Sequence, residues 1–386
     1  MAQFGDHYRS IYLAGAGGEA PSIPIAWREL AARAEEALGE RAAAYVFGSA
    51  GSGDTERSNR RAFDSWRIVP RMLRDVAERD LAVSPFGSDW PAPLALAPVG
   101  VQTIVHPDGE LATARAAARL GVPITVGTMA GHTLERVADE LGDSPALFQL
   151  YWPNDTEIAE SFVTRAEAAG YEAIVVTVDN AFPGWKPRDL QEAYLPAIEG
   201  VGLANYFSDP VFRSSLESPP EEDRGAAIGR FIGVFGNPSL TWDDLEWLRA
   251  RTSLPILLKG ILHPDDAREA RERGIDGIVV SNHGGRQVDG AIASLDALPP
   301  IADAVGEDIT ILLDSGVRSG ADAVKALALG ADAVLLGRPY LWGLALEGTD
   351  GVEKVLSHVL AELDLTMGLS GFTAPDQLSP ELLVRR

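Results

Sequence analysis

Apolar runs of strand length recur along the chain from residue 94 onward, and most of them are separated by helical patterns such as residues 110–120, 155–169 and 321–329. Strands that alternate with helices form a parallel sheet, and eight such units are what a (β/α)8 barrel requires. The eight runs are residues 94–100, 123–129, 146–151, 173–179, 255–260, 277–283, 310–316 and 333–339. An open, doubly wound α/β sheet is the alternative fold. Eight units that end in polar or glycine residues favour the barrel, which is also called a TIM barrel.

The repeating pattern is interrupted once, between Asp179 and Pro255, by a stretch much longer than one helix with its loops. A long excursion at the carboxyl end of a barrel strand is typically a lid over the site or a packing insertion. We therefore expect an N-terminal helical segment over residues 1–90, packed on a barrel over residues 91–386. The barrel carries an insertion after its fourth strand, at about residues 183–250.

Composition excludes several classes of protein. The formal net charge of −23 argues against nucleic acid as a partner. No run of 18 apolar residues predicts a membrane span. The chain contains no cysteine, which excludes disulfides and thiolate metal sites, and the spacing of its histidines predicts no other metal site. A cytoplasmic enzyme is the expectation that remains.

A histidine ends the sixth apolar run, and an arginine follows three residues later. Residues 281–287 read Ser281-Asn282-His283-Gly284-Gly285-Arg286-Gln287. Histidine has an ordinary pKa near neutrality and is suited to accepting a proton, and arginine can bind a carboxylate through two parallel hydrogen bonds. A base and an anion clamp at one strand end indicate chemistry on a carbon atom next to a carboxylate.

The other strand ends are also polar, and in a barrel they converge on one face. Loops after the seventh and eighth strands often bind phosphate, so Arg318 and Arg338 predict a phosphorylated ligand. Lys259 ends an apolar strand, and a lysine so placed should meet an anion or an electron-rich ring, or else form a Schiff base. Asp179 is a candidate to orient His283 and to stabilise its charged form.

These motifs resemble the FMN-dependent 2-hydroxy acid oxidase and dehydrogenase family, which includes glycolate oxidase, lactate oxidase, lactate 2-monooxygenase and mandelate dehydrogenase. The resemblance rests on residues 281–287, Lys259, the segment 314–318 and Gly337-Arg338, and it runs from about Tyr45 to the final helix. It is closest to lactate 2-monooxygenase, through residues 63–75, 184–190 and 259–267.

The resemblance implies a role for each matching residue. His283 would accept a proton with Asp179 as its partner, and Lys259 would stabilise the negative charge of the reduced flavin. Arg286, Lys186, Tyr45 and Tyr151 would bind the substrate, with Met129 in the side-chain pocket. The FMN-binding residues would be Pro98, Val99, Gly100, Gly127, Gln149, Thr177, Lys259, Ser281, Asp314, Ser315, Gly316, Arg318, Gly337 and Arg338.

Two positions depart from the family pattern. Lys186 stands where a second arginine usually faces the substrate carboxylate; lysine keeps the charge and loses the planar fork. Met129 occupies a position that is tryptophan in glycolate oxidase, so the shape of the side-chain pocket differs.

The resemblance implies oxidation of a small, lactate-like L-2-hydroxy acid to the 2-oxo acid, with oxygen as the acceptor. Coupled decarboxylation would make the enzyme a monooxygenase. The alternatives are a dehydrogenase with another electron acceptor, a non-redox FMN- or phosphate-binding isomerase, and a flavin-binding protein that has lost turnover through the Lys186 change. Family members commonly form homotetramers or homo-octamers, and no membrane or nucleic-acid partner is expected.

Overall fold

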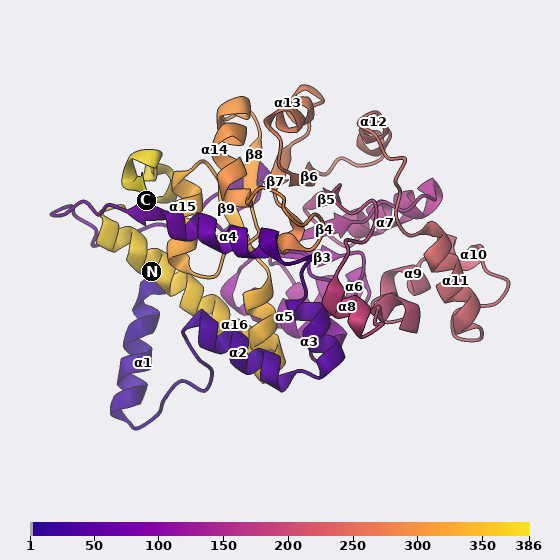
Figure 1. Ribbon diagram of the computed structural model, residues 1–386, viewed down its shortest axis with the longest axis horizontal. Coiled ribbons are helices and arrows are strands. Elements are labelled where there is room, and N and C mark those ends of the chain that lie inside the picture. The colour runs from indigo at the N-terminus through magenta and orange to yellow at the C-terminus, as the bar shows by residue number, and fades with distance from the viewer. Residues whose placement is uncertain (1–2) are drawn as a thin grey trace.

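The computed structural model describes residues 3–386, which contain a closed barrel of eight parallel strands (Figure 1). The strands follow one another around the barrel in chain order, and the last strand pairs with the first. Their bounds are β2 Leu94–Leu96, β3 Ile124–Gly127, β4 Ala146–Leu150, β5 Ala173–Thr177, β6 Ile256–Ile261, β7 Gly277–Val280, β8 Thr310–Leu313 and β9 Ala333–Leu336. The (β/α)8 barrel is confirmed, and the closed ring rules out the open doubly wound sheet.

The barrel strands are buried on both faces because helices cover the outside and side chains fill the inside. Small and branched residues form the inner core, including Ala95, Leu147, Val175, Leu257 and Val279. The covering helices are α5 Gly109–Leu120, α6 Leu134–Leu141, α7 Thr156–Ala168, α12 Asp244–Arg249, α13 Pro264–Glu272, α14 Ser294–Val305, α15 Gly320–Ala328 and α16 Arg338–Ser370. Within residues 3–386, none of the helices has both the length and the apolar character needed to cross a bilayer.

The segment before the barrel is mostly helical. It contains η1 Phe4–Asp6, α1 His7–Ala16, α2 Trp27–Ala37, α3 Glu40–Phe47 and α4 Asp54–Ser65. Helix α2 packs on α16, and α4 packs on α14 and on the loop that follows β7. Strand β1 (Trp66–Ile68) pairs with the C-terminal strand β10 (Leu383–Arg385), which ties this segment to the end of the chain. Helices α3 and α4 are thereby held over the carboxyl ends of the barrel strands.

The excursion between β5 and β6 contains α8 Pro187–Gln191, η4 Pro196–Glu199, α9 Ala204–Ser208, α10 Pro210–Ser214 and α11 Arg224–Val234. Helices α9, α10 and α11 gather at one end of the molecule, opposite α1 (Figure 1). Tyr206 is fully buried there among Phe162 of α7, Phe212 and Phe231, with ring centroids 4.9 to 5.5 Å from its own. This aromatic cluster fixes the distal part of the excursion to the barrel.

Several of the observed strands end before the apolar runs do. The backbone turns into the left-handed region soon after three of the strands, at Val101 (φ 60°), His283 (φ 58°) and Ser315 (φ 73°). Such a conformation is rare for residues other than glycine and ends strand pairing. The polar ends of the apolar runs are therefore loops that open onto one face of the barrel.

Candidate active site

His283 lies between two polar side chains at the carboxyl end of the barrel. Its Nδ1 is 2.9 Å from Oδ1 of Asp179, and its Nε2 is 3.3 Å from the hydroxyl of Tyr151. Burial acts to raise the pKa of Asp179, but the charge of His283, its hydrogen bond and the charge of Lys259 outweigh burial and lower that pKa. The aspartate therefore stays ionised at neutral pH and supports a positive charge on the imidazole.

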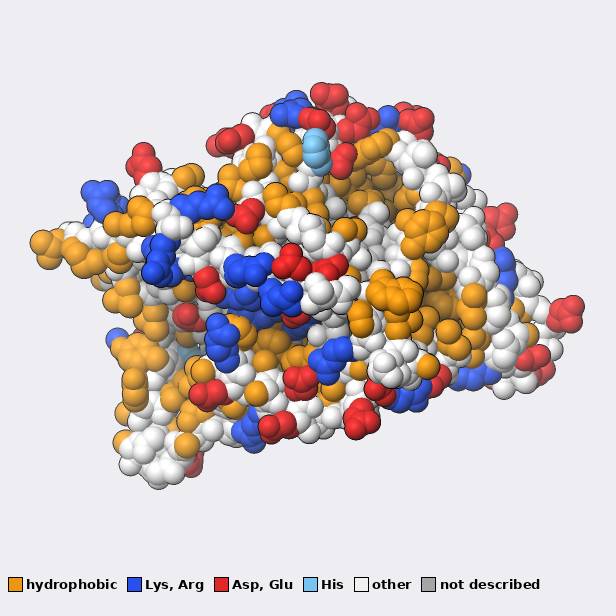
Figure 2. Space-filling view, in the orientation of Figure 1, with side chains coloured by type: hydrophobic (Ala, Val, Ile, Leu, Met, Phe, Trp, Pro, Cys, Tyr) orange, Lys and Arg blue, Asp and Glu red, His pale blue; other side chains and the backbone are white. Residues whose placement is uncertain are grey.

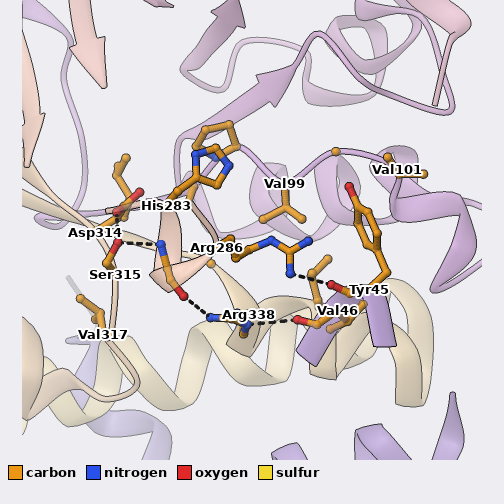
Figure 3. Close-up of a pocket in the computed structure, with 18 of the residues that line it drawn as sticks. Tyr45, Val46, Val99, Val101, His283, Arg286, Asp314, Ser315, Val317 and Arg338 are labelled. Atoms are coloured by element: carbon orange, nitrogen blue, oxygen red, sulfur yellow. Dashed lines mark hydrogen bonds between the residues drawn. The ribbon is translucent and has the colours of Figure 1, made fainter. Parts of the chain in front are cut away.

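The loop that carries His283 is anchored from two sides. Asn282 and Asn59 of α4 exchange hydrogen bonds of 2.8 and 2.7 Å between their buried amides. Ser315, after β8, accepts a hydrogen bond of 2.9 Å from the backbone N–H of Gly284 (Figure 3). These contacts hold the left-handed backbone at His283, and with it the direction of the imidazole.

Lys259 is buried at the end of β6 and meets an anion, as its position predicts. Its Nζ lies 3.1 Å from Oδ2 of Asp314 and donates a hydrogen bond of 2.9 Å to the hydroxyl of Ser281. Burial acts to lower the pKa of Lys259, but the charges of Asp314 and Asp179 reverse that effect and raise it. Because the ammonium group stays protonated, it is poorly suited to Schiff-base formation and well suited to stabilise a negative charge.

Arg286 points toward α3 (Figure 3). Its Nη1 donates hydrogen bonds of 2.8 Å to the carbonyl of Tyr45 and 2.7 Å to that of Gly48. The guanidinium lies over the Tyr45 ring, 5.0 Å from the centroid, and Nη2 is 3.9 Å from Asp189. Lys186 contributes a second positive charge near Arg286. Burial lowers the pKa of Lys186, and the charge of Arg286 lowers it further.

Two further arginines, Arg318 and Arg338, line the same cavity. Arg338 lies beside Arg286, since both donate to the carbonyl of Gly48, and its Nη1 is 3.9 Å from Glu56. Arg318 is 8% exposed, donates 2.8 Å to the carbonyl of Val317 and lies over the Trp342 ring. Within residues 3–386, this carbonyl and this ring are the partners of the Arg318 guanidinium, and neither is an anion. Burial, with the charge of Arg338 next, lowers the pKa of Arg318 to about 9, the mark of a cation that lacks an anion.

Arg338 bonds to three carbonyls, those of Val46, Gly284 and Gly48, at 2.9 to 3.0 Å (Figure 3). Burial lowers its pKa to about 10. On the face shown in Figure 2, Lys and Arg side chains also gather around α4, with several Asp and Glu side chains among them. The buried cationic end of the cavity fits a phosphate group.

Comparison with known proteins decides the family. A model of the family described as FMN-dependent dehydrogenase matches residues 34–385. The chain belongs to the FMN-dependent dehydrogenase family. It is 46% identical to an L-lactate oxidase of Lysinibacillus sphaericus, over 94% of this chain and 93% of that protein. It is 42% identical to human 2-hydroxyacid oxidase 1, over 85% of this chain and 87% of that protein.

Among solved structures, mandelate oxidase bound to (S)-4-hydroxymandelic acid is similar with a TM-score of 0.84 and 38% identity. The match covers 94% of this chain and 99% of that chain. The relatives of this chain thus include oxidases of 2-hydroxy acids, and its cofactor is FMN.

The structure brings most of the predicted site residues to one cavity. Those that line it directly are Tyr45, Pro98, Val99, Gly100, Lys259, His283, Arg286, Asp314, Ser315, Gly316, Arg318, Gly337 and Arg338. Gln149 and Thr177 lie at the ends of β4 and β5, joined by a hydrogen bond of 2.9 Å, and the Gln149 side chain lies close to Gly127. Met129 is buried against Gly100, behind the residues that line the cavity.

Two contributors were not predicted from the sequence. Gln287 Nε2 donates to the carbonyl of Asp179 at 2.6 Å and to Oδ1 of Asn180 at 2.8 Å, which fastens the loop after β5. Asp189 lies buried beside Arg286. One sequence pattern could have identified Asp189. Pro187 is typical of the start of a helix, and Asp189 follows Lys186 by three residues, a spacing that places two side chains on the same face of a helix.

Proposed function

We propose that this protein oxidises a small L-2-hydroxy acid to the 2-oxo acid, with oxygen as the electron acceptor. The observation that carries the proposal is His283, held by Asp179 at 2.9 Å, in the same cavity as the clamp residue Arg286. The substrate loses two electrons and two protons, and oxygen takes them up to become hydrogen peroxide. The similarity to L-lactate oxidase and 2-hydroxyacid oxidase supports this reaction class.

The cavity would hold FMN along its length. Arg318, Gly337 and Arg338 would bind the phosphate, which supplies the anion that the buried guanidinium of Arg318 lacks. Asp314 would bind the ribityl hydroxyls, while Lys259 would lie beside the flavin ring. Pro98, Val99, Gly100, Gly127, Gln149, Thr177, Ser281, Ser315 and Gly316 complete the proposed set. Bound FMN supplies the two-electron acceptor that amino-acid side chains lack.

In this proposal His283 accepts the proton, and Asp179 stabilises the imidazolium that results. Tyr151, whose hydroxyl touches Nε2 of His283, binds the substrate hydroxyl next to the base. Arg286, Tyr45 and Lys186 bind the carboxylate. This division of roles places the reacting carbon between a general base and an electron acceptor.

Because of Lys186, substrate binding should weaken in alkaline solution. Burial, and then the charge of Arg286, lower the pKa of Lys186. Lysine is charged only below its pKa, so carboxylate binding should weaken as the pH rises through that lowered value. Lys186→Arg should move the dependence to higher pH, because the ordinary pKa of arginine lies about two units or more above that of lysine, and should lower KM for lactate about three- to tenfold in alkaline solution.

The measurement is KM for L-lactate between about pH 7 and pH 10 in the wild type and in Lys186→Arg. Lys354→Arg on α16, where the lysine pairs with Glu347, is the matched control and should behave as the wild type. A KM that rises equally in all three proteins would show that Lys186 does not bind the carboxylate. If lactate reduced the flavin only in Lys186→Arg, the result would instead support the alternative that the wild-type protein has lost turnover through the change to lysine at position 186.

We further propose that peroxide and the oxo acid can react before release, as in a monooxygenase. With lactate, pyruvate and peroxide would give acetate, carbon dioxide and water. Retention needs a closed site, and the segment around Phe182 and Trp185 lies at the loop that Gln287 fastens. Both side chains are exposed, at 69% and 73%, while hydrogen bonds to Gln287 hold the backbone, so closure would come from these two side chains folding over the site.

The decisive experiment is anaerobic addition of a panel of L-2-hydroxy acids to the yellow protein, followed by admission of oxygen. Loss of flavin absorbance and its return with oxygen are expected. Acetate and carbon dioxide among the products identify a monooxygenase, and pyruvate and peroxide an oxidase. Return of colour only with an added dye identifies a dehydrogenase with another acceptor. If no hydroxy acid bleaches the flavin, the proposed oxidation is wrong and a non-redox isomerase remains.

A further inference from the structure

Asp189 is a buried carboxylate whose oxygens accept no hydrogen bond from residues 3–386. Its exposed fraction is 7%, and the nearest cation, Nη2 of Arg286, is 3.9 Å away. The Asp189 carboxylate also lies against the backbone of Gly48, and only glycine leaves room for it there, because a Cβ at position 48 would lie 2.8 Å from Oδ1 of Asp189. A carboxylate held in this way is costly unless nearby positive charge compensates for its lost hydration.

A purely structural role does not explain Asp189. Helix α8 has only five residues, and the Asp189 oxygens cap none of its backbone N–H groups. The orientation of Arg286 does not depend on Asp189 either, since Nη1 is fixed by the carbonyls of Tyr45 and Gly48. What remains is the charge. Burial raises the pKa of Asp189 above its ordinary value, although the charges of Arg286 and then Lys186 act against that rise.

The charges of the clamp and of Asp189 balance with one bound carboxylate. Arg338, which shares the carbonyl of Gly48 with Arg286, has Glu56 as its own counter-charge at 3.9 Å. Arg286 and Lys186 contribute two positive charges, and Asp189 contributes one negative charge. Arg188, the other cation near Asp189, is paired with Glu35 at 2.8 Å on the surface. A monocarboxylate therefore neutralises the group, whereas a second carboxylate on the same ligand would leave excess negative charge in a partly buried site.

We propose that Asp189 is a built-in counter-charge that sets this site for monocarboxylic rather than dicarboxylic 2-hydroxy acids. The inference rests on the proposed function, because it takes Arg286 and Lys186 as the carboxylate clamp. Asp189 acts through those two cations and is a specificity-determining residue. Removing its charge should favour every anionic ligand and should favour a dianion most.

The test compares Asp189→Asn with the wild-type holoenzyme, using butanoate and succinate as four-carbon ligands with one and two carboxylates. Their dissociation constants are measured without turnover, from the change that each ligand causes in flavin absorbance. Binding of succinate relative to butanoate should rise on the order of tenfold in Asp189→Asn. The ratio is internal to each protein, so it stays meaningful even if only part of the variant folds.

Two further variants separate charge from structure. Glu192→Gln removes an exposed carboxylate three residues along the chain and should leave the ratio unchanged. Adding Asp189→Asn to Lys186→Arg should again raise the ratio, because arginine stays charged when its counter-charge is removed. A ratio within twofold of the wild type in both Asp189→Asn proteins overturns the inference. Failure of the proposed oxidation would be seen separately, as wild-type flavin that no hydroxy acid reduces.

Discussion

Replacing His283 with asparagine should slow flavin reduction by a 2-hydroxy acid about a thousandfold while leaving the bound flavin spectrum intact. The imidazole is the proposed proton acceptor, and a positioned general base contributes roughly 10²- to 10⁴-fold to a rate. Asparagine is the suitable replacement because the backbone at position 283 has φ 58°, which asparagine tolerates better than most residues. The loop should therefore keep its shape, and the change should fall on the chemical step.

Single-turnover reduction under anaerobic conditions measures this directly. His263→Asn is the matched control: that histidine is exposed at the start of α13, where its side chain accepts the N–H of Asp265, a capping role that asparagine also fills. The control should reduce at the wild-type rate. If His283→Asn kept more than about a tenth of that rate, a histidine base would be untenable.

Replacing Arg318 with methionine should weaken FMN binding about ten- to a hundredfold, as expected for losing charge-assisted hydrogen bonds to a phosphate. The same change should raise the melting temperature of the FMN-free protein. Burial lowers the pKa of Arg318 to about 9, so the folded apoprotein holds its positive charge at a cost at neutral pH. The sign follows from linkage: a base whose pKa is lower in the folded state destabilises that state until the pH rises through the lowered value.

Thermal unfolding with and without added FMN, together with an FMN titration of the apoprotein, tests both halves of this prediction. Arg61→Met on α4 removes an exposed arginine, with its side chain 64% exposed, and should change neither quantity. An apoprotein destabilised by Arg318→Met, with unaltered FMN affinity, would assign Arg318 to the fold rather than to the cofactor.

Much of the fold could be predicted from the sequence, because the pattern of apolar residues along each segment shows which of its faces are buried. Strands buried on both faces need continuous apolar runs, and helices that cover them need a repeat of three to four residues. The positions where those runs become polar predicted which strand ends carry chemistry, including Lys259, His283 and Arg318. The strand ends themselves were predicted less well, because the left-handed backbone at His283 and Ser315 ends pairing early.

The sequence by itself determined the barrel and the presence of a base and an anion clamp within one loop, because these depend on neighbours in the chain. Only the tertiary structure decided the partners. Asp179 and His283 are separated by 104 positions and follow β5 and β7, so their contact depends on the pairing of β6 with both of these strands. Packing between distant segments likewise pairs Lys259 with Asp314 and buries Asp189 beside Arg286. The residues next to each of these positions in the chain do not indicate that packing.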